Sequence, residues 1–462
     1  MALVQRSRTR FLAASHGCGP FSDAPVGAWD PTLIRLDYIR RPLERLSYMS
    51  KNKYTSIDLF AGAGGLSLGL HLAEIRGLFG IEKDAMAFET LRKNLVGSES
   101  PYNAYPSWPA WLPIEPMDIQ SLLEDEYMVE QLAKLRGQVS VIAGGPPCQG
   151  FSVGGSRNGL DERNKLVFEM LTVIGIVIPK IAIIENVEGI TRRFVARPGD
   201  KSETSVADQV VEHLNSLGYD ATFKVIDVSK FGVPQTRKRT LIVGVHSSVG
   251  KLARDFFAEL EELREEHLCT LGLDPVRATS AAEALEDLNN PSGRQPSPEW
   301  PRFQTSTYKI AESAYARLLR GKVPEGSFPD SHRYPNHGTK VLDLFEKAHA
   351  TQPFGRLAKE FLRANNCKSD KKVLIDPELP VSTLTSHPDE FIHYSEPRSV
   401  TVREMARLQS FPDDFVFTGR YTINGDRRGL DVARCVQVGN AVPPIFALAV
   451  GTAIKKVLDG NV

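Results

Sequence analysis

A cysteine in a loop of glycines and prolines is the first residue of this 462-residue chain whose setting indicates chemistry. Cys148 lies in the segment GGPPCQGFS, directly after an apolar run, Val139–Ala143, that we predict to be a strand. Open α/β sheets bind their ligands at the carboxyl ends of strands. The prolines restrict the approach to Cys148, and the glycines after it allow the loop to close over a substrate. A lone cysteine is more often an inert buried thiol, but this setting favours a nucleophile.

Three charged residues accompany other predicted strands. Glu185 ends the apolar run Ile181–Ile184, and an acid at that position is costly unless it is paired or functional. Arg237 and Arg239 lie in the segment QTRKR just before a further strand, where guanidinium groups could hold a base and phosphates. The alternatives are a structural acid–arginine pair and a solvated basic run. We expect these three residues to be catalytic together with Cys148.

A glycine-rich turn near residue 62 could bind a nucleotide-like cofactor. It connects a predicted strand, Ser56–Phe60, to a predicted helix, Leu66–Ile75. Glycines let the backbone approach a ligand closely, and the start of a helix offers free amide donors. Glu82 ends the next predicted strand, where its carboxylate could accept hydrogen bonds from ribose hydroxyls. Taken alone, this pattern fits a dinucleotide-binding fold and a methyltransferase equally well.

An alternation of strands and helices must position these residues. From Tyr54 to His246, short apolar runs alternate with amphipathic stretches, which favours a parallel sheet with helices on both faces. The six predicted strands are Ser56–Phe60, Gly77–Ile81, Val139–Ala143, Ile181–Glu185, Ala221–Asp227 and Arg239–Val245. The predicted fold class is therefore α/β.

The pattern changes after His246, which predicts a second, smaller domain. The predicted helices beyond this point are Leu252–Leu268, Tyr308–Leu319 and Thr401–Gln409. Residues 1–53 lack clear periodicity and are expected to form an extension. Two interpretations of it remain open: translation begins at Met49, or the segment is an ordinary N-terminal arm.

The composition excludes several classes of protein. Basic and acidic residues both number 56, so the net charge is zero and any nucleic-acid surface must be a local basic patch. The five cysteines lie far apart without zinc-type spacing, which predicts neither a disulfide framework nor a metal site. The most apolar stretch, Leu171–Ile184, is short and interrupted, so we predict no membrane span. A reducing cytoplasm is the expected location.

With these residues in place, the chain resembles the DNA (cytosine-5) methyltransferase family of the bacterial restriction-modification type. The family's motif blocks occur in the usual order from about residue 54 to 455, apart from a variable middle. The matching blocks are DLFAGAGG from Asp58, GPPCQGFS from Gly145, ENV from Glu185, QTRKR from Gln235, RSVTVREMARLQSFPDDF from Arg398 and QVGNAVPP from Gln437. So many independent blocks in order would not be expected by chance.

The resemblance implies a Rossmann-like fold with a doubly wound, mostly parallel sheet and a smaller target-recognition domain. It also implies S-adenosyl-L-methionine as the cofactor. The residues that it places at the cofactor are Phe60, Ala61, Gly62, Gly64, Gly65, Leu66, Glu82, Asp118, Ile119, Pro146, Asn440 and Ala441.

The resemblance further implies a covalent reaction on a cytosine that is flipped out of double-stranded DNA. Cys148 would add to carbon 6 of the ring, and the resulting enamine would attack the methylsulfonium through carbon 5. Glu185 would donate a proton to ring nitrogen 3, while Arg239 holds the exocyclic oxygen. Loss of the proton at carbon 5 would then release the enzyme.

Four segments follow from the residue pattern and the resemblance together. They are an N-terminal extension (1–53), a catalytic and cofactor-binding domain (54–246), a target-recognition domain (247–390) and a C-terminal segment that completes the catalytic domain (391–462). The expected protein is a monomer associated with the nucleoid. A cognate restriction endonuclease that acts on the same site would be a further partner.

Three rival functions remain open at this point. A nicotinamide-dependent oxidoreductase would explain the glycine loop and Glu82, but not Cys148, Glu185 or the arginine motif. A transfer-RNA cytosine-5 methyltransferase would share the motifs, although the large variable region favours DNA. A DNA-binding protein that has lost catalysis is less consistent with the sequence, because every catalytic position is filled.

Overall fold

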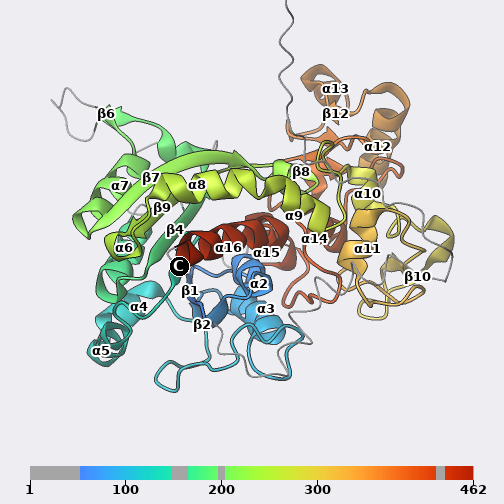
Figure 1. Cartoon of the computed structure of the whole chain (residues 1–462). Coiled ribbons are helices and arrows are strands. Elements are labelled where there is room, and N and C mark those ends of the chain that lie inside the picture. The colour runs from blue at the N-terminus through green and yellow to red at the C-terminus, as the bar shows by residue number, and fades with distance from the viewer. Residues whose placement is uncertain (1–52, 148–164, 196–202, 423–431, 461–462) are drawn as a thin grey trace, which may run out of the picture.

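The computed structural model describes residues 53–147, 165–195, 203–422 and 432–460. Six strands form the central sheet of the larger lobe (Figure 1). They are β1 (Thr55–Leu59), β2 (Arg76–Ile81), β3 (Val141–Gly144), β4 (Ile181–Val187), β7 (Tyr219–Asp227) and β9 (Lys238–His246). All six predicted strands are present, each within two residues of its predicted ends.

The sheet is mostly parallel, with the order β2-β1-β3-β4-β9-β7. The pairs β1–β2, β1–β3 and β3–β4 are parallel, whereas β9 runs antiparallel to both of its neighbours. A parallel neighbour needs a long crossover, usually through a helix. Only ten residues separate β7 from β9, so the chain returns in the opposite direction. The mostly parallel sheet that the resemblance implies is therefore confirmed, with β9 as its antiparallel strand.

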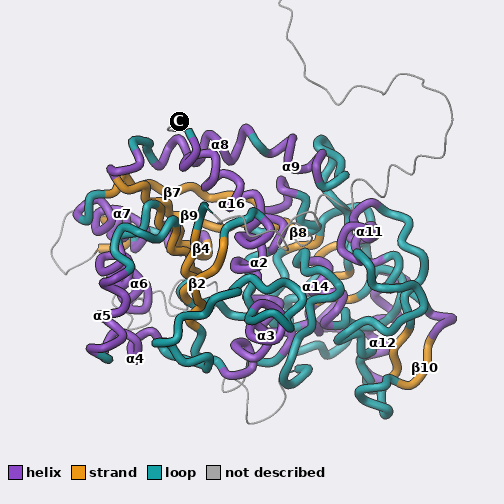
Figure 2. Tube along the Cα trace, turned by 60° about the horizontal axis from the view of Figure 1, so that its bottom comes forward, coloured by secondary structure: helices purple, strands orange, loops and turns teal. Residues whose placement is uncertain are grey.

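Helices cover both faces of the sheet, because alternate strand residues point to opposite sides. Ile181 and Ile183 belong to a core shared with α2 (Gly65–Leu72), α8 (Ala253–Glu262) and α16 (Pro444–Asp459). The intervening Ala182 and Ile184 belong to a second core on the other face. The helices there are α4 (Ile119–Glu124), α5 (Glu126–Lys134), α6 (Lys165–Val177) and α7 (Val206–Ser216). The doubly wound α/β architecture is confirmed (Figures 1 and 2).

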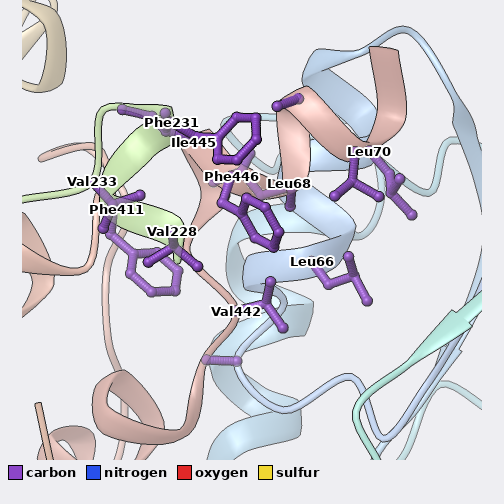
Figure 3. Packing of buried hydrophobic residues seen from close by; sticks show 14 of the residues in the cluster. Leu66, Leu68, Leu70, Val228, Phe231, Val233, Phe411, Val442, Ile445 and Phe446 are labelled. Carbon is purple, nitrogen blue, oxygen red and sulfur yellow. The ribbon is translucent and has the colours of Figure 1, made fainter. Parts of the chain in front are cut away.

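The last helix returns the end of the chain to the cofactor loop. α16 lies beside α2 and α8 in the larger lobe (Figure 1). Gly69 permits this contact, since a Cβ at Gly69 would lie 2.2 Å from Cβ of Ala447. Figure 3 shows the surrounding packing of Leu68 and Phe446. Within the described residues, Arg434–Asp459 is long and apolar enough to cross a membrane, yet 61% of its apolar window is buried, as expected of a core helix.

The second lobe, at the right of Figures 1 and 2, contains short strands and helices. Its elements are α10 (Ala281–Leu285), β10 (Arg294–Pro296), β11 (Gln304–Ser306), α11 (Ala314–Arg320), α12 (Thr339–Thr351), β12 (Gly355–Arg356), α13 (Lys359–Ala364), β13 (Val373–Leu374) and β15 (Phe391–Ile392). Part of this lobe has its own small core around Phe345. The other elements are α3 (Ala85–Leu95), β5 (Phe194–Val195), β6 (Glu203–Thr204), β8 (Gln235–Thr236), α9 (Arg264–Thr270), β14 (Val381–Ser382), α14 (Val402–Leu408) and α15 (Arg434–Asn440).

The helix predictions were less accurate than the strand predictions. The helix predicted to begin at Leu66 ends at Leu72, because Glu74 adopts a left-handed backbone with φ of 63°. The helix predicted over Leu252–Leu268 is two helices, α8 and α9, that meet at Leu263. Another begins only at Ala314, where Ser313 caps its first turn.

Candidate active site

A pocket of about 1470 Å³ lies at the carboxyl ends of β1, β2, β3 and β4, where an open α/β sheet is expected to bind ligands. It gathers residues from the two ends of the sequence. The predicted site residues that line it are Phe60, Ala61, Gly62, Gly65, Leu66, Glu82, Asp118, Ile119, Pro146, Glu185, Arg237, Arg239, Asn440 and Ala441. Cys148 lies outside the described residues, which include its neighbours Pro146 and Pro147 in the pocket wall.

Gly64 is the one described site residue that does not line the pocket. It precedes α2 with a left-handed backbone, φ 91°. A Cβ there would lie 2.5 Å from Cδ1 of Leu95. Gly64 therefore allows the turn and the close packing of α2 against α3.

Glu82 organises the cofactor end of the pocket. Its carboxylate accepts hydrogen bonds from the backbone amides of Gly62 (2.9 Å) and Asp84 (2.8 Å). Burial raises the pKa of Glu82, and these two hydrogen bonds oppose that rise. The acid thus connects the end of β2 to the glycine turn after β1, and its oxygens face a nucleotide-sized space.

Asp58 is a second buried acid at this end, and the sequence analysis gave it no role. It is 1% exposed and lines the pocket, and one carboxylate oxygen accepts a hydrogen bond from the hydroxyl of Ser67. Its other oxygen, Oδ1, has no hydrogen-bond partner among the residues that the structure describes. Burial raises the pKa of Asp58 to about 7, with a further contribution from the charge of Glu82. An acid inside an otherwise apolar strand was a signal that could have identified it.

Glu185 and Arg239 form a buried ion pair at the other end of the pocket. Nε of Arg239 lies 2.8 Å from Oε1 of Glu185, and both side chains are only 11% exposed. They come from neighbouring antiparallel strands, β4 and β9. Burial lowers the pKa of Arg239, and the charge of Glu185 opposes this effect. The pair presents an acid and a guanidinium side by side, as recognition of a polar ring edge requires.

Asn186 connects this pair to the loop that contains Cys148. Its side-chain amide donates to the carbonyl of Pro146 (2.9 Å) and therefore holds the beginning of that loop. Gly145, the residue before Pro146, lies next to Glu185, because a Cβ at Gly145 would be 3.1 Å from Oε2 of Glu185. The described part of the loop thus begins beside the acid.

Arg237 is placed differently from Arg239. It is 2% exposed, and its guanidinium donates to the backbone carbonyls of Leu384 (3.2 Å) and Gly439 (3.0 Å). No ion pair of Arg237 with an acid is found in the described residues. The two arginines of the motif therefore make different kinds of contact.

Residues from the variable region also reach the pocket. Thr383, Leu384, Thr385 and Ser386 line it, and the sequence analysis did not place them there. At its rim, Arg192 and Lys238 are exposed cations. No group of three or more His, Cys, Asp or Glu suited to a metal ion occurs among the described residues.

Comparison with known proteins agrees with this geometry. The chain matches the family model of the C-5 cytosine-specific DNA methylases over residues 54–456. It is similar to the type II methyltransferase M1.HphI of Haemophilus parahaemolyticus, at 28% identity over 87% of each chain. It is also similar to M.DdeI of Desulfomicrobium norvegicum, at 28% identity over 86% of this chain and 88% of the relative.

The fold agrees as well. A solved E. coli structure, assigned as a DNA modification methyltransferase encoded within a prophage, aligns with a TM-score of 0.60 at 23% identity. The alignment covers 88% of this chain and 100% of that chain. The oxidoreductase and transfer-RNA alternatives are not favoured, because the matching family acts on cytosine in DNA. Since the family model spans every motif block described above, the chain belongs to the C-5 cytosine-specific DNA methylases and methylates carbon 5 of cytosine in DNA.

Proposed function

We propose that this protein modifies one specific sequence of double-stranded DNA, with S-adenosyl-L-methionine as methyl donor, as the modification enzyme of a type II restriction-modification system. The type II methyltransferases among its relatives support this assignment. In this proposal the enzyme is a cytoplasmic, nucleoid-associated monomer, and a cognate endonuclease cuts the same sequence.

One observation carries the proposal: a single pocket has two chemically different ends. Asp58 and Glu82 lie at one end, and the Glu185–Arg239 pair lies at the other. The unpartnered oxygen of Asp58 suits a positively charged group, and Glu82 suits ribose hydroxyls. The residues present therefore fit S-adenosyl-L-methionine, which when bound supplies an electrophilic methyl group next to the target ring.

The side chains of this protein would then act on the flipped base. The Cys148 thiolate attacks carbon 6, which makes carbon 5 nucleophilic. Glu185 holds or donates a proton at ring nitrogen 3, and Arg239 stabilises charge on the exocyclic oxygen. Asn186 keeps the nucleophile loop beside Glu185 through its hydrogen bond to Pro146. The proton at carbon 5 then leaves, and the Cys148–carbon bond breaks.

We assign DNA recognition to the variable region within residues 247–390, and completion of the catalytic domain to residues 391–462. Base-edge contacts carry sequence information, whereas the pocket meets only the flipped cytosine. The exposed Arg192 and Lys238 at the rim suit the phosphates that flank that cytosine. Residues 1–53 would be dispensable for the reaction.

The test is methyl transfer from labelled S-adenosyl-L-methionine to DNA and to transfer RNA, followed by bisulfite sequencing of the DNA. We expect transfer to DNA alone, at one sequence. Cys148→Ser should abolish transfer while leaving cofactor affinity nearly unchanged, because a hydroxyl is a far weaker nucleophile. Cys269→Ser is the matched control and should remain active. Near wild-type transfer by Cys148→Ser would refute the nucleophile, and labelling of transfer RNA instead would refute the substrate.

A further inference from the structure

Arg237 joins two segments that are far apart in the sequence. Its guanidinium donates to the carbonyl of Leu384 in the variable region, and to the carbonyls of Gly439 (3.0 Å) and Ala441 (3.5 Å) near the end of the chain. All three residues line the pocket. The planar, rigid fork of an arginine presents separated donors that can bridge such acceptors, whereas the three donors of a lysine radiate from one nitrogen.

Neighbouring glutamines extend the same connection. Gln235 accepts the backbone amide of Leu384 at 2.9 Å and donates to the side chain of Gln409. Gln409 in turn donates to the carbonyl of Ala441 at 2.6 Å. A Cβ at Gly439 would lie only 2.6 Å from the carbonyl oxygen of Thr385, so the two segments also touch directly. The arginine motif thus lies between two segments that line the pocket. One is residues 384–386, called the 384–386 wall below, and the other is residues 439–441 at the end of α15.

Stability alone does not account for a cation at this position. Burial lowers the pKa of Arg237 well below its usual value, the nearby charge of Arg239 lowers it further, and the charge of Glu185 opposes these effects only in part. Within the described residues, Nε of Arg237 has no hydrogen-bond partner, and carbonyl groups rather than a carboxylate contact the guanidinium. A buried charge that contacts no acid is unfavourable for folding, so its position requires another explanation.

The two arginines also divide the work by geometry. Residues 235, 237 and 239 are every second residue of an extended segment, so their side chains point to the same face. Arg239 reaches Glu185 at the catalytic end, whereas Arg237 reaches main chain on both sides of the pocket. Both terminal nitrogens of Arg237 donate to backbone carbonyls, which holds them away from a base in the pocket.

We propose that Arg237 is a positioning residue, not a catalytic one: it fixes the 384–386 wall against residues 439–441 at the end of α15, and so couples the shape of the target-base end of the pocket to that of the cofactor end. The proposal rests on S-adenosyl-L-methionine as the cofactor. If both segments are held by one side chain, its loss should weaken binding of cofactor and DNA while the chemical step on the bound base proceeds. Loss of Arg239 should do the reverse.

The experiment compares steady-state kinetics and calorimetric cofactor affinity for Arg237→Lys, Arg237→Met and Arg239→Lys. For Arg237→Met we expect KM for both substrates, and Kd for S-adenosyl-L-methionine, to rise at least about tenfold while kcat falls less than about threefold. Arg237→Lys, which keeps the charge and some donors, should lie between Arg237→Met and the wild type. Arg239→Lys should lower kcat with little change in either KM.

A matched control separates positioning from general destabilisation. Val243→Ala removes buried volume from β9, the strand that follows Arg237, without touching the pocket. It should lower the melting temperature and leave both KM values unchanged. The proposal is overturned if Arg237→Lys lowers kcat with unchanged KM, which would mean contact with the base, or if Val243→Ala reproduces the rise in KM. Failure of the wild-type protein to bind S-adenosyl-L-methionine would instead overturn the proposed cofactor.

Discussion

At the scale of single residues, two buried acids at the cofactor end of the pocket have different surroundings. Glu82 accepts two backbone amides, which stabilise its charged form. Asp58 accepts one hydrogen bond, from the hydroxyl of Ser67, and its second oxygen accepts none from the described residues. This difference explains why the pKa of Asp58 is raised to about 7: the effect of burial outweighs that of its single hydrogen bond. A charge-bearing ligand in the pocket would change that balance.

Asp58 should make stability depend on pH. Its pKa is raised from 3.8 to about 7 in the folded protein, so its contribution to folding is fully present below about pH 4 and is lost as pH rises through about 7. The lost contribution is up to about 4 kcal/mol, from about 1.4 kcal/mol per pKa unit. Asp58→Asn should remove this slope. Urea unfolding of the cofactor-free protein between pH 4 and 8 measures it.

The control for this measurement is Asp343→Asn, since Asp343 is exposed and lies far along the chain in α12. Its curve should parallel that of the wild type. Equal slopes for Asp58→Asn and the wild type would mean that Asp58 is charged throughout this range, and that its unpartnered oxygen is solvated.

Sequence reasoning identified some of these residues and not others. Glu82 and Glu185 were found because each acid ends an apolar strand, a pattern visible over a few positions. The contact of Gln409 with Gln235 was not foreseen, because hydrogen bonds between residues 174 apart leave no local periodicity. For the same reason the contacts of Arg237 could not be read from its motif. The assigned roles of all these residues stay predictions.

At the scale of elements, helix α14 is buried along its whole length although it contains two arginines and a glutamate. Arg407 binds two carboxylates, from Asp287 (2.9 Å) and Asp413 (2.6 Å). Arg403 lies 2.9 Å from Asp330. Burial tends to raise the pKa of Asp287, but the charges and hydrogen bonds of Arg407 and Arg320 together outweigh burial, so the net pKa is lowered. The motif block that begins at Arg398 thus contributes Arg403, Arg407 and Asp413 to an ion-pair network between the lobes.

Removing the centre of this network should be costly. Arg407→Met leaves Asp287 and Asp413 buried without their main counter-ion, so we expect a loss of about 3–5 kcal/mol in the free energy of unfolding. Urea denaturation at pH 7 measures the loss. Adding Asp287→Asn and Asp413→Asn to Arg407→Met should restore part of it, because the uncompensated charges are gone.

A surface pair provides the comparison. Nζ of Lys347 lies 2.7 Å from Oδ2 of Asp343, a distance similar to those in the buried network, but both side chains are more than half exposed. Lys347→Met should therefore cost less than about 1 kcal/mol. If Arg407→Met cost no more than Lys347→Met, the buried network would not fasten the two lobes.

Element prediction succeeded where a pattern is local. The six strands were predicted from short apolar runs. The antiparallel direction of β9 was not predicted, since a run of apolar residues does not indicate the direction of a strand. The ten-residue connection between β7 and β9 was the available sign that β9 is antiparallel. Most strands of the second lobe have only two or three residues, too few for any alternation to be recognised.

At the scale of the whole molecule, the sequence placed a change of composition at residue 247, but packing continues across it. α8 packs on α16 and β7, and α9 lies against the turn after β7 (Figure 1). Phe256 and Leu268 belong to the same core as the sheet. Similarly, β14 pairs with β8 in the arginine motif. The segment that can vary without disturbing the catalytic lobe is therefore shorter than the predicted domain.

The final prediction follows from this difference. The buried hydrophobic side chains of residues 339–374 all belong to the small core around Phe345. Exchange of residues 339–374 for the corresponding segment of a relative should therefore change which cytosines are methylated, while the reaction itself persists. Exchange of residues 247–390 should instead yield protein that fails to fold, because it replaces α8, α9 and β14 together. Bisulfite sequencing of plasmid DNA reads the methylated sites, and the comparison is made among chimeras that still bind S-adenosyl-L-methionine.

Each outcome locates specificity. A folded, active 339–374 chimera with a new recognition sequence would assign base contacts to the second lobe, which lies at the right of Figure 2. The same chimera with the original recognition sequence would place those contacts outside 339–374, for example in the 384–386 wall that Arg237 holds. If they lie in that wall, the wider exchange should transfer specificity once it is made to fold, because only that exchange includes the wall.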